Sequence, residues 1–118
     1  MISRRDWLVL SCALLAGCGR RRFRKLVAGD AILAVGDSLT AGFGAPKGAD
    51  YPAQLAQILG RKVINGGVSG DTSAQALARL PDLLAQKPKL VVVSIGGNDF
   101  LQRQPESGTR ENIRKMVA

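Results

Sequence analysis

Short apolar runs recur along the chain from residue 31 onward and predict three strands. Ala31 to Val35 reads AILAV, Lys62 to Asn65 reads KVIN, and Leu90 to Ile95 reads LVVVSI. Runs of this length, bounded by glycine or polar residues, are typical of buried strands. The last run is apolar nearly throughout, which predicts a central strand covered on both faces.

Between and after these runs, the apolar positions follow a helical repeat. Three helices are predicted, with the apolar positions Tyr51, Leu55, Ile58 and Leu59; Leu77, Leu80 and Leu84; and Ile113, Met116 and Val117. Asp71 or Thr72 is expected to cap the second helix. Pro81 is expected to kink that helix or divide it in two, and the third helix is expected to start at Thr109.

Strand and helix alternate in this order, which predicts an α/β fold with a parallel sheet. The expected architecture is a three-layer, flavodoxin-like sheet formed by residues 31–118. The run LVVVSI has no later strand to pair with on its far side, and natural sheets avoid such an exposed apolar edge. We therefore expect the domain to be partial and truncated at its C-terminus.

Three polar, glycine-bearing blocks each follow one predicted strand. They are Gly36–Leu39 (GDSL), Ser69–Ser73 (SGDTS) and Gly96–Asp99 (GGND). In open parallel sheets the site lies outside the carboxyl ends of the strands, so the three blocks are expected to meet at one edge. Each block also has a purely structural interpretation. Ser38 could cap a turn, Gly70 could form a turn, and Asn98 could occupy a left-handed turn position.

The three blocks resemble the first three blocks of the SGNH hydrolases, also called the GDSL esterase family. The SGDTS block and Ala78–Pro81 (ARLP) are similar to the branch of bacterial arylesterases and multifunctional thioesterase/lysophospholipases. The resemblance implies an SGNH hydrolase fold and hydrolysis of carboxylic esters or thioesters. No cofactor is expected, and no metal, because the sequence contains no cluster of metal-ligating residues.

The resemblance also implies roles for individual residues. Ser38 is the implied nucleophile, which forms an acyl-enzyme. The implied oxyanion hole consists of the Ser38 amide, the Gly70 amide and the side-chain amide of Asn98. Asp37 and Asp99 are expected to support their loops by accepting backbone hydrogen bonds rather than to act on substrate.

The chain contains no histidine, although a serine nucleophile needs a general base matched to neutral pH. In the family that base belongs to a later Asp-x-x-His block, which this sequence lacks. A lysine base is conceivable, and Lys47 is the nearest lysine, but nothing in the sequence indicates that it is desolvated. The glycine-rich segment 42–48 lacks the Gly-Lys-Ser/Thr ending of a phosphate loop, so a phosphate-binding role is not expected.

Because the base is missing, we expect a hydrolase whose 118-residue chain has little or no activity alone. The alternative is an inactive truncated lipoprotein remnant with at most an acyl- or membrane-binding role.

The first 17 residues have the layout of a bacterial lipoprotein signal peptide. Arg4 and Arg5 precede the apolar run Trp7–Ala16, and Leu15-Ala16-Gly17-Cys18 resembles a lipobox, which implies lipid attachment at Cys18. A membrane-spanning helix is the competing interpretation, but the apolar run has about half the required length. The two arginines fit either a twin-arginine or an ordinary export signal. With Cys12 removed and Cys18 lipidated, no cysteine pair remains for a disulfide.

The net charge of +8 is concentrated just after this signal. A basic tether is expected over residues 18–30, with the cationic residues Arg20, Arg21, Arg22, Arg24 and Lys25. Beside a lipid anchor these cations favour contact with anionic headgroups, and a solvated linker is the alternative. Nucleic acid is not expected, because aromatic residues do not alternate with the cations. The expected location is the cell envelope, with the lipid-anchored domain facing the periplasm and no known protein partner.

Overall fold

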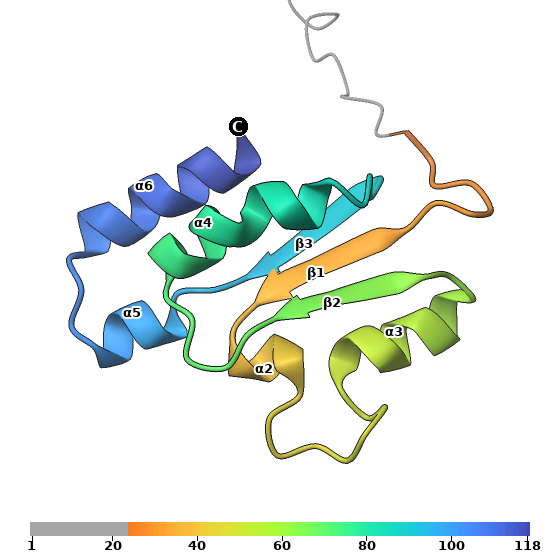
Figure 1. The fold of residues 1–118 in the computed structure, drawn as a ribbon, viewed down its shortest axis with the longest axis horizontal. Coiled ribbons are helices and arrows are strands. Elements are labelled where there is room, and N and C mark those ends of the chain that lie inside the picture. Colours follow the sequence, from red (N-terminus) through yellow and green to blue (C-terminus); the bar gives the residue numbers. More distant parts are fainter. Residues whose placement is uncertain (1–23) are drawn as a thin grey trace, which may run out of the picture.

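The computed structural model describes residues 24–118 (Figure 1). The expected signal peptide, the lipidation site Cys18 and the arginines Arg20, Arg21 and Arg22 lie outside the described residues. Arg24 and Lys25 are described, and both are exposed on the segment that leads into the first strand. Within residues 24–118, no helix has the length and apolar character needed to cross a membrane.

A three-stranded parallel sheet organises the described residues. Its strands are β1 (Ile32–Gly36), β2 (Val63–Gly67) and β3 (Leu90–Ser94), in the order β2-β1-β3. The three predicted strands and their parallel arrangement are confirmed. The central strand is β1, in which every residue is buried, and not the run LVVVSI. Within residues 24–118, β3 pairs only with β1, so Leu90 and Ser94 at its ends are exposed.

Helices cover both faces of this sheet, which confirms the predicted three-layer α/β architecture. Figure 1 shows α4 (Ser73–Leu84) and α6 (Glu106–Val117) on one side and α3 (Tyr51–Leu59) on the other. Leu33 and Val35 of β1 pack against Ala76 and Leu80 of α4 to form the core. The partly buried side chains Ile64, Leu83, Val91, Ile95 and Met116 complete it.

The helices differ from the sequence expectation in several details. In α4 it is Leu83 that packs on the core, whereas Leu84 is 43% exposed at the end of the helix. Pro81 does not divide α4, which continues as one helix to Leu84. Helix α6 begins at Glu106, before Thr109, and Val117 lies on its solvent side.

Two further helices were not predicted, because each is too short to show a repeat. They are α2 (Ser38–Ala41) and α5 (Gly97–Leu101). Each follows the carboxyl end of a strand, and they contain three of the predicted site residues, Ser38 in α2 and Asn98 and Asp99 in α5.

Candidate active site

Three segments meet at the carboxyl end of the sheet, and they contain the three sequence blocks. They are α2 after β1, the loop 68–72 after β2, and α5 after β3 (Figure 1). The Val68 amide donates to the Gly36 carbonyl oxygen at 3.1 Å, which joins the first two blocks. The Asn98 side chain donates to the Asp71 carbonyl oxygen at 2.9 Å, which joins the second and third. The expected convergence of the blocks at one edge is thus present.

Ser38 is the first residue of α2, directly beyond the buried strand β1. The residue that caps this helix is Asp37, whose Oδ1 accepts a hydrogen bond from the Leu39 amide at 3.0 Å. The purely structural interpretation of Ser38 as the cap is therefore wrong. Within residues 24–118, the Ser38 hydroxyl has no hydrogen-bond partner, and the residue is half-buried. This leaves the hydroxyl available to another group.

The glycine that precedes Asp37 allows α2 to lie against the end of the sheet. A Cβ on Gly36 would overlap the Thr40 side chain and would lie 2.5 Å from the carbonyl oxygen of Ser94. Thr40 is itself fully buried, so it has no free space into which it could move. The close approach of α2 to β1 and β3 therefore requires glycine at position 36.

Gly70 lies on the exposed loop between β2 and α4. Its φ of +87° is in the left-handed region that favours glycine, so it does form a turn there. A Cβ at this position would meet nothing within 4 Å, so the backbone conformation and not crowding selects the residue. Within the described part of the chain, neither the Gly70 amide nor the Ser38 amide donates a hydrogen bond. Two unused backbone donors therefore lie on neighbouring segments of the edge.

Asn98 lies in the first turn of α5 in a right-handed conformation. The left-handed turn interpretation is wrong, because Lys87 and Arg103 are the only non-glycine residues with positive φ among residues 24–118. The hydrogen bond to the Asp71 carbonyl uses one N–H of the Asn98 amide group. A primary amide has two such donors, so one remains for a further acceptor.

Asp99 anchors α5 through its buried carboxylate. Its Oδ2 accepts a hydrogen bond from the Ser73 amide at 2.7 Å, and its Oδ1 accepts from the Ser73 hydroxyl at 2.5 Å. Thr109 Oγ1 donates to the same Oδ1 at 3.0 Å. Asn112 in turn donates to the Ser73 hydroxyl oxygen at 2.9 Å. The residue next to Asn98 is thereby tied to both α4 and α6.

These hydrogen bonds outweigh burial in setting the charge state of Asp99. Burial alone raises the pKa of the carboxyl group, because it penalises the charged form. The hydrogen bonds from Ser73 and Thr109 favour the carboxylate, and the net result is a pKa below the usual 3.8. Asp99 is therefore ionised at neutral pH and acts as a hydrogen-bond acceptor. Asp99 was expected to accept a backbone hydrogen bond, and it accepts one from the Ser73 amide.

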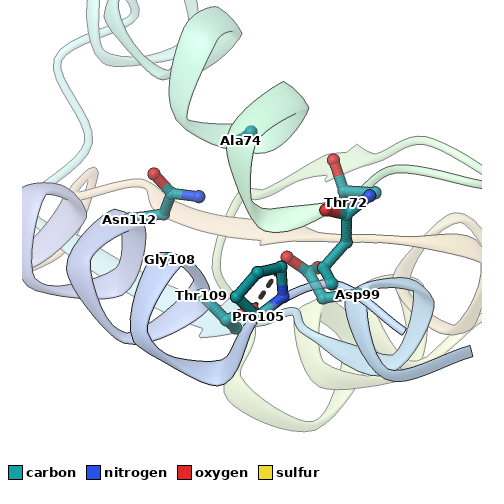
Figure 2. Close-up of a pocket in the computed structure, with 8 residues that line it drawn as sticks. Thr72, Ala74, Asp99, Pro105, Gly108, Thr109 and Asn112 are labelled. Atoms are coloured by element: carbon teal, nitrogen blue, oxygen red, sulfur yellow. Dashed lines mark hydrogen bonds between the residues drawn. The ribbon is translucent and has the colours of Figure 1, made fainter. Parts of the chain in front are cut away.

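A cavity of about 150 Å³ lies behind this network, between the start of α4 and the start of α6 (Figure 2). Its lining residues are Thr72, Ala74, Asp99, Gln104, Pro105, Gly108, Thr109 and Asn112. A second cavity of about 300 Å³ adjoins Phe100 and Glu106 and shares Asp99, Gln104 and Thr109 with the first. Neither of these two cavities is lined by Ser38, Gly70 or Asn98. Gly70 is exposed, and Ser38 and Asn98 are half-buried.

Asp71 and Arg79 contribute a further link that the sequence did not predict. Asp71 does not cap α4, because Thr72 does so in a reciprocal pair with Gln75. Asp71 Oδ2 instead accepts from Arg79 Nε at 2.6 Å, and Arg79 Nη2 donates to the Gly36 carbonyl oxygen at 3.0 Å. The sequence offered one indication of this ion pair, namely that Asp71 lies in the block SGDTS and Arg79 in the block ARLP.

Asn65 at the end of β2 is a second residue that the sequence did not single out. Its Nδ2 donates to the Thr40 carbonyl oxygen at 2.9 Å and to Asp50 Oδ1 at 3.2 Å. Its Oδ1 accepts from the Gly67 amide at 2.9 Å. Asn65 therefore holds α2 and the residue that caps α3 against β2.

No general base accompanies Ser38 in the described chain. Lys47, the one lysine considered for this role, is exposed on the loop between α2 and α3. Its side chain forms no hydrogen bond or ion pair with another part of residues 24–118. The arrangement thus combines a free serine hydroxyl with three unused N–H donors, and it lacks a proton acceptor.

The chain resembles known proteins over most of its length. It matches the model of the GDSL-like lipase/acylhydrolase family over residues 34–118. It is 42% identical to thioesterase 1/protease 1/lysophospholipase L1 of Escherichia coli (strain K12), over 79% of this chain and 46% of that protein. It is 39% identical to esterase TesA of Pseudomonas aeruginosa, over 88% of this chain and 55% of that protein.

A solved structure agrees with these sequence matches. The crystal structure of AlinE4, described as an SGNH-hydrolase family esterase, superposes with a TM-score of 0.73 at 40% identity. The match covers 79% of this chain and 53% of AlinE4. The fold is therefore that of the SGNH hydrolases. The chain spans about half the length of the curated relatives it matches.

Proposed function

The chain belongs to the GDSL-like lipase/acylhydrolase family, and we propose that it supplies the nucleophile of a hydrolase acting on carboxylic esters or thioesters. Ser38 Oγ attacks the acyl carbon, the alcohol or thiol leaves, and water then releases the acid from the acyl-enzyme. Support comes from the free Ser38 hydroxyl at the carboxyl end of the central strand. The names thioesterase and esterase of the relatives support the same reaction class.

The oxyanion hole is proposed to consist of the Ser38 amide, the Gly70 amide and the side-chain amide of Asn98. The observation that carries this proposal is that all three groups have an unused N–H within residues 24–118. Preset donors of this kind stabilise the charge that develops on the carbonyl oxygen, and removing one typically costs about 100- to 1000-fold in rate.

We propose that the proton acceptor for Ser38 comes from outside this 118-residue chain, which contains no histidine. The chain alone then has little or no hydrolytic activity, because the serine hydroxyl is a weak nucleophile without a base. The same absence favours the second candidate, an inactive truncated lipoprotein remnant that retains at most acyl or membrane binding.

Free imidazole separates the two candidates. The chain would be incubated with a chromogenic short-chain ester, with and without imidazole, and acylation of Ser38 would be followed by mass spectrometry. We expect an acyl adduct on Ser38 only when imidazole is present. The adduct should be absent from Ser38→Ala and should persist in Ser69→Ala, which alters an exposed serine of the neighbouring block.

Two results would contradict this proposal. If no adduct forms on Ser38 with imidazole, the remnant becomes the better account. If Ser38-dependent turnover occurs without imidazole, the chain already holds a base.

We also propose that the protein is exported and anchored in the cell envelope by lipid on Cys18, with the domain facing the periplasm. The lipobox-like LAGC and the arginines that follow it support this location. Replacement of Cys18 by alanine should abolish the incorporation of labelled palmitate into the protein when it is produced in bacteria. Equal incorporation in both forms would contradict lipid attachment at Cys18.

A further inference from the structure

The carboxyl edge of the sheet carries four large apolar side chains that face solvent. Leu39 on α2 is 76% exposed, and Phe43 on the loop after α2 is 83% exposed. Phe100 and Leu101 on α5 are 83% and 75% exposed. We call these four residues the apolar rim. They lie on the two segments that flank the loop 68–72, and hence on either side of the candidate site (Figure 1).

Exposure of this degree is concentrated at the apolar rim. Among residues 24–118, the other large apolar side chains that are more than 70% exposed are Ile58 at 79% and Val117 at 71%. These two residues lie near the ends of α3 and α6, away from the site. Single exposed apolar residues are normal on a protein surface, whereas a group beside a site indicates that something binds there.

The exposed charged side chains around the apolar rim that lack an ion-pair or helix-cap partner within residues 24–118 are positive. Lys47 and Arg103 are exposed on the turns that follow α2 and α5, and neither forms an ion pair within residues 24–118. The acidic side chains of the same edge are already engaged. Asp37 and Asp50 cap helices, Asp71 pairs with Arg79, Glu106 pairs with Arg110, and Asp99 is buried. Apolar side chains flanked by free cations suit an anionic lipid surface.

The geometry points to a membrane-docking face at this edge. Leu39, Phe43, Phe100 and Leu101 enter the headgroup region of an anionic bilayer, while Lys47 and Arg103 contact lipid phosphates. Ser38 is then presented to acyl esters that remain partly in the membrane. The choice of substrate rests on the proposed function, but the docking itself does not require hydrolysis.

The place where the chain enters the sheet is compatible with this orientation. Residues 24–31 lead into the amino end of β1, at the opposite end of the strand from the apolar rim (Figure 1). The 13 residues from 18 to 30 can reach at most about 45 Å when extended, whereas the five residues of β1 span about 16 Å. A domain tethered at Cys18 can therefore turn its apolar rim toward the membrane that holds the tether.

Tryptophan reporters test the orientation directly. In a Trp7→Phe background, which removes the only native tryptophan, a single tryptophan would replace Phe43, Phe100 or Ile58. Each full-length variant would be bound to phosphatidylglycerol-containing vesicles whose acyl chains carry bromine, a short-range quencher. Phe43→Trp and Phe100→Trp should lose most of their fluorescence. Ile58→Trp, which starts from similar exposure, should retain most of it.

Three results would overturn the proposal. Equal quenching at positions 43, 100 and 58 would mean that the domain has no preferred orientation on the membrane. No quenching at 43 and 100 in vesicle-bound protein would mean that another surface, such as a second copy of the chain, covers the apolar rim. Quenching of the same size on zwitterionic vesicles would remove the role of the cations. Adding Ser38→Ala should leave the quenching unchanged, which separates docking from hydrolysis.

Discussion

Ser38 and Asn98 lie in the first turns of two very short helices, yet the two helices are held in different ways. The start of α2 is held locally, since Asp37 caps the helix and accepts from the Leu39 amide two residues away, and it is the later residue Thr40 that has a distant partner, Asn65. Helix α5 has no side-chain cap at its start. It is held instead by Asp99, whose partners Ser73 and Thr109 lie 26 and 10 residues away in sequence.

This difference separates the two parts of the candidate site. The position of Ser38, the proposed nucleophile, depends on the Asp37 cap, on the hydrogen bond from Asn65 to the Thr40 carbonyl oxygen and on the close packing of α2 against β1. The position of the Asn98 amide depends on how α4 and α6 pack. Changes in those two distant helices should therefore displace the Asn98 amide group while leaving Ser38 in place.

The largest expected effect comes from Gly36→Ala, which attacks the packing of α2. The added Cβ would overlap Thr40 and the Ser94 carbonyl, so α2 and β3 must both shift. Overpacking of this kind should lower the free energy of unfolding by about 3 kcal/mol, measured by urea denaturation. Gly108→Ala in α6 is the control, because a Cβ there meets nothing within 4 Å. It should stabilise the protein by roughly 0.5–1 kcal/mol. Equal stability of the two variants would show that the contact at Gly36 is not tight.

Asp99→Asn should have the next largest effect, because it weakens the long-range support of α5. The amide replaces a carboxylate that accepts three hydrogen bonds, and it turns an N–H toward donors of Ser73 or Thr109. We expect a loss of about 2 kcal/mol in the free energy of unfolding. The same urea titration measures it, and an unchanged midpoint would contradict the anchoring role.

The acid dependence of stability provides a sharper control for that variant. The pKa of Asp99 is lower in the folded chain than the usual 3.8. Above pH 3.8 the ionised Asp99 carboxylate therefore makes its full contribution to the free energy of unfolding. The contribution is lost as the pH falls below 3.8 and through the folded pKa, because the unfolded chain then binds the proton more tightly. Asp99→Asn should lose less stability than the parent over that range. Asp82→Asn, at an exposed position of α4, should follow the parent curve.

Asp37→Ala should have the smallest effect of the three, because it removes a single local cap. The expected loss is about 1 kcal/mol, whereas Asp37→Asn should cost less because asparagine also caps helices. Hydrogen exchange should show faster exchange confined to α2 and the loop after it. If exchange also rises in α5, the two site helices are coupled and the contrast between them fails.

The elements with strong local patterns could be predicted from the sequence. Three apolar runs gave the strands, and the spacing of blocks after them gave the edge at which the candidate site lies. The choice between Leu83 and Leu84 in α4 could not be made, because both extend the same apolar stripe and only packing on β1 selects one. Asp71 and Thr72 are both good caps, and the pairing of Asp71 with Arg79 decides between them.

The support of α5 had no local signature at all. Ser73, Thr109 and Asn112 are ordinary polar residues in sequence, and they meet Asp99 or one another only after α4 and α6 have packed. The short helices α2 and α5 were missed for a related reason. Four or five residues hold too few positions for a helical repeat, so only the tertiary structure defines them.

The central position of β1 also has a consequence for the order of folding. Ile32 pairs with Val63 on one side and with Leu90 on the other, which are 31 and 58 residues further along the chain. Pairings over such distances form slowly, because a long loop must close before any contact compensates for its entropy. The first strand to be synthesised therefore cannot pair on both of its edges until the last of the three described strands is available. While the chain is being made, its most thoroughly buried strand stays half-paired until Leu90 has emerged.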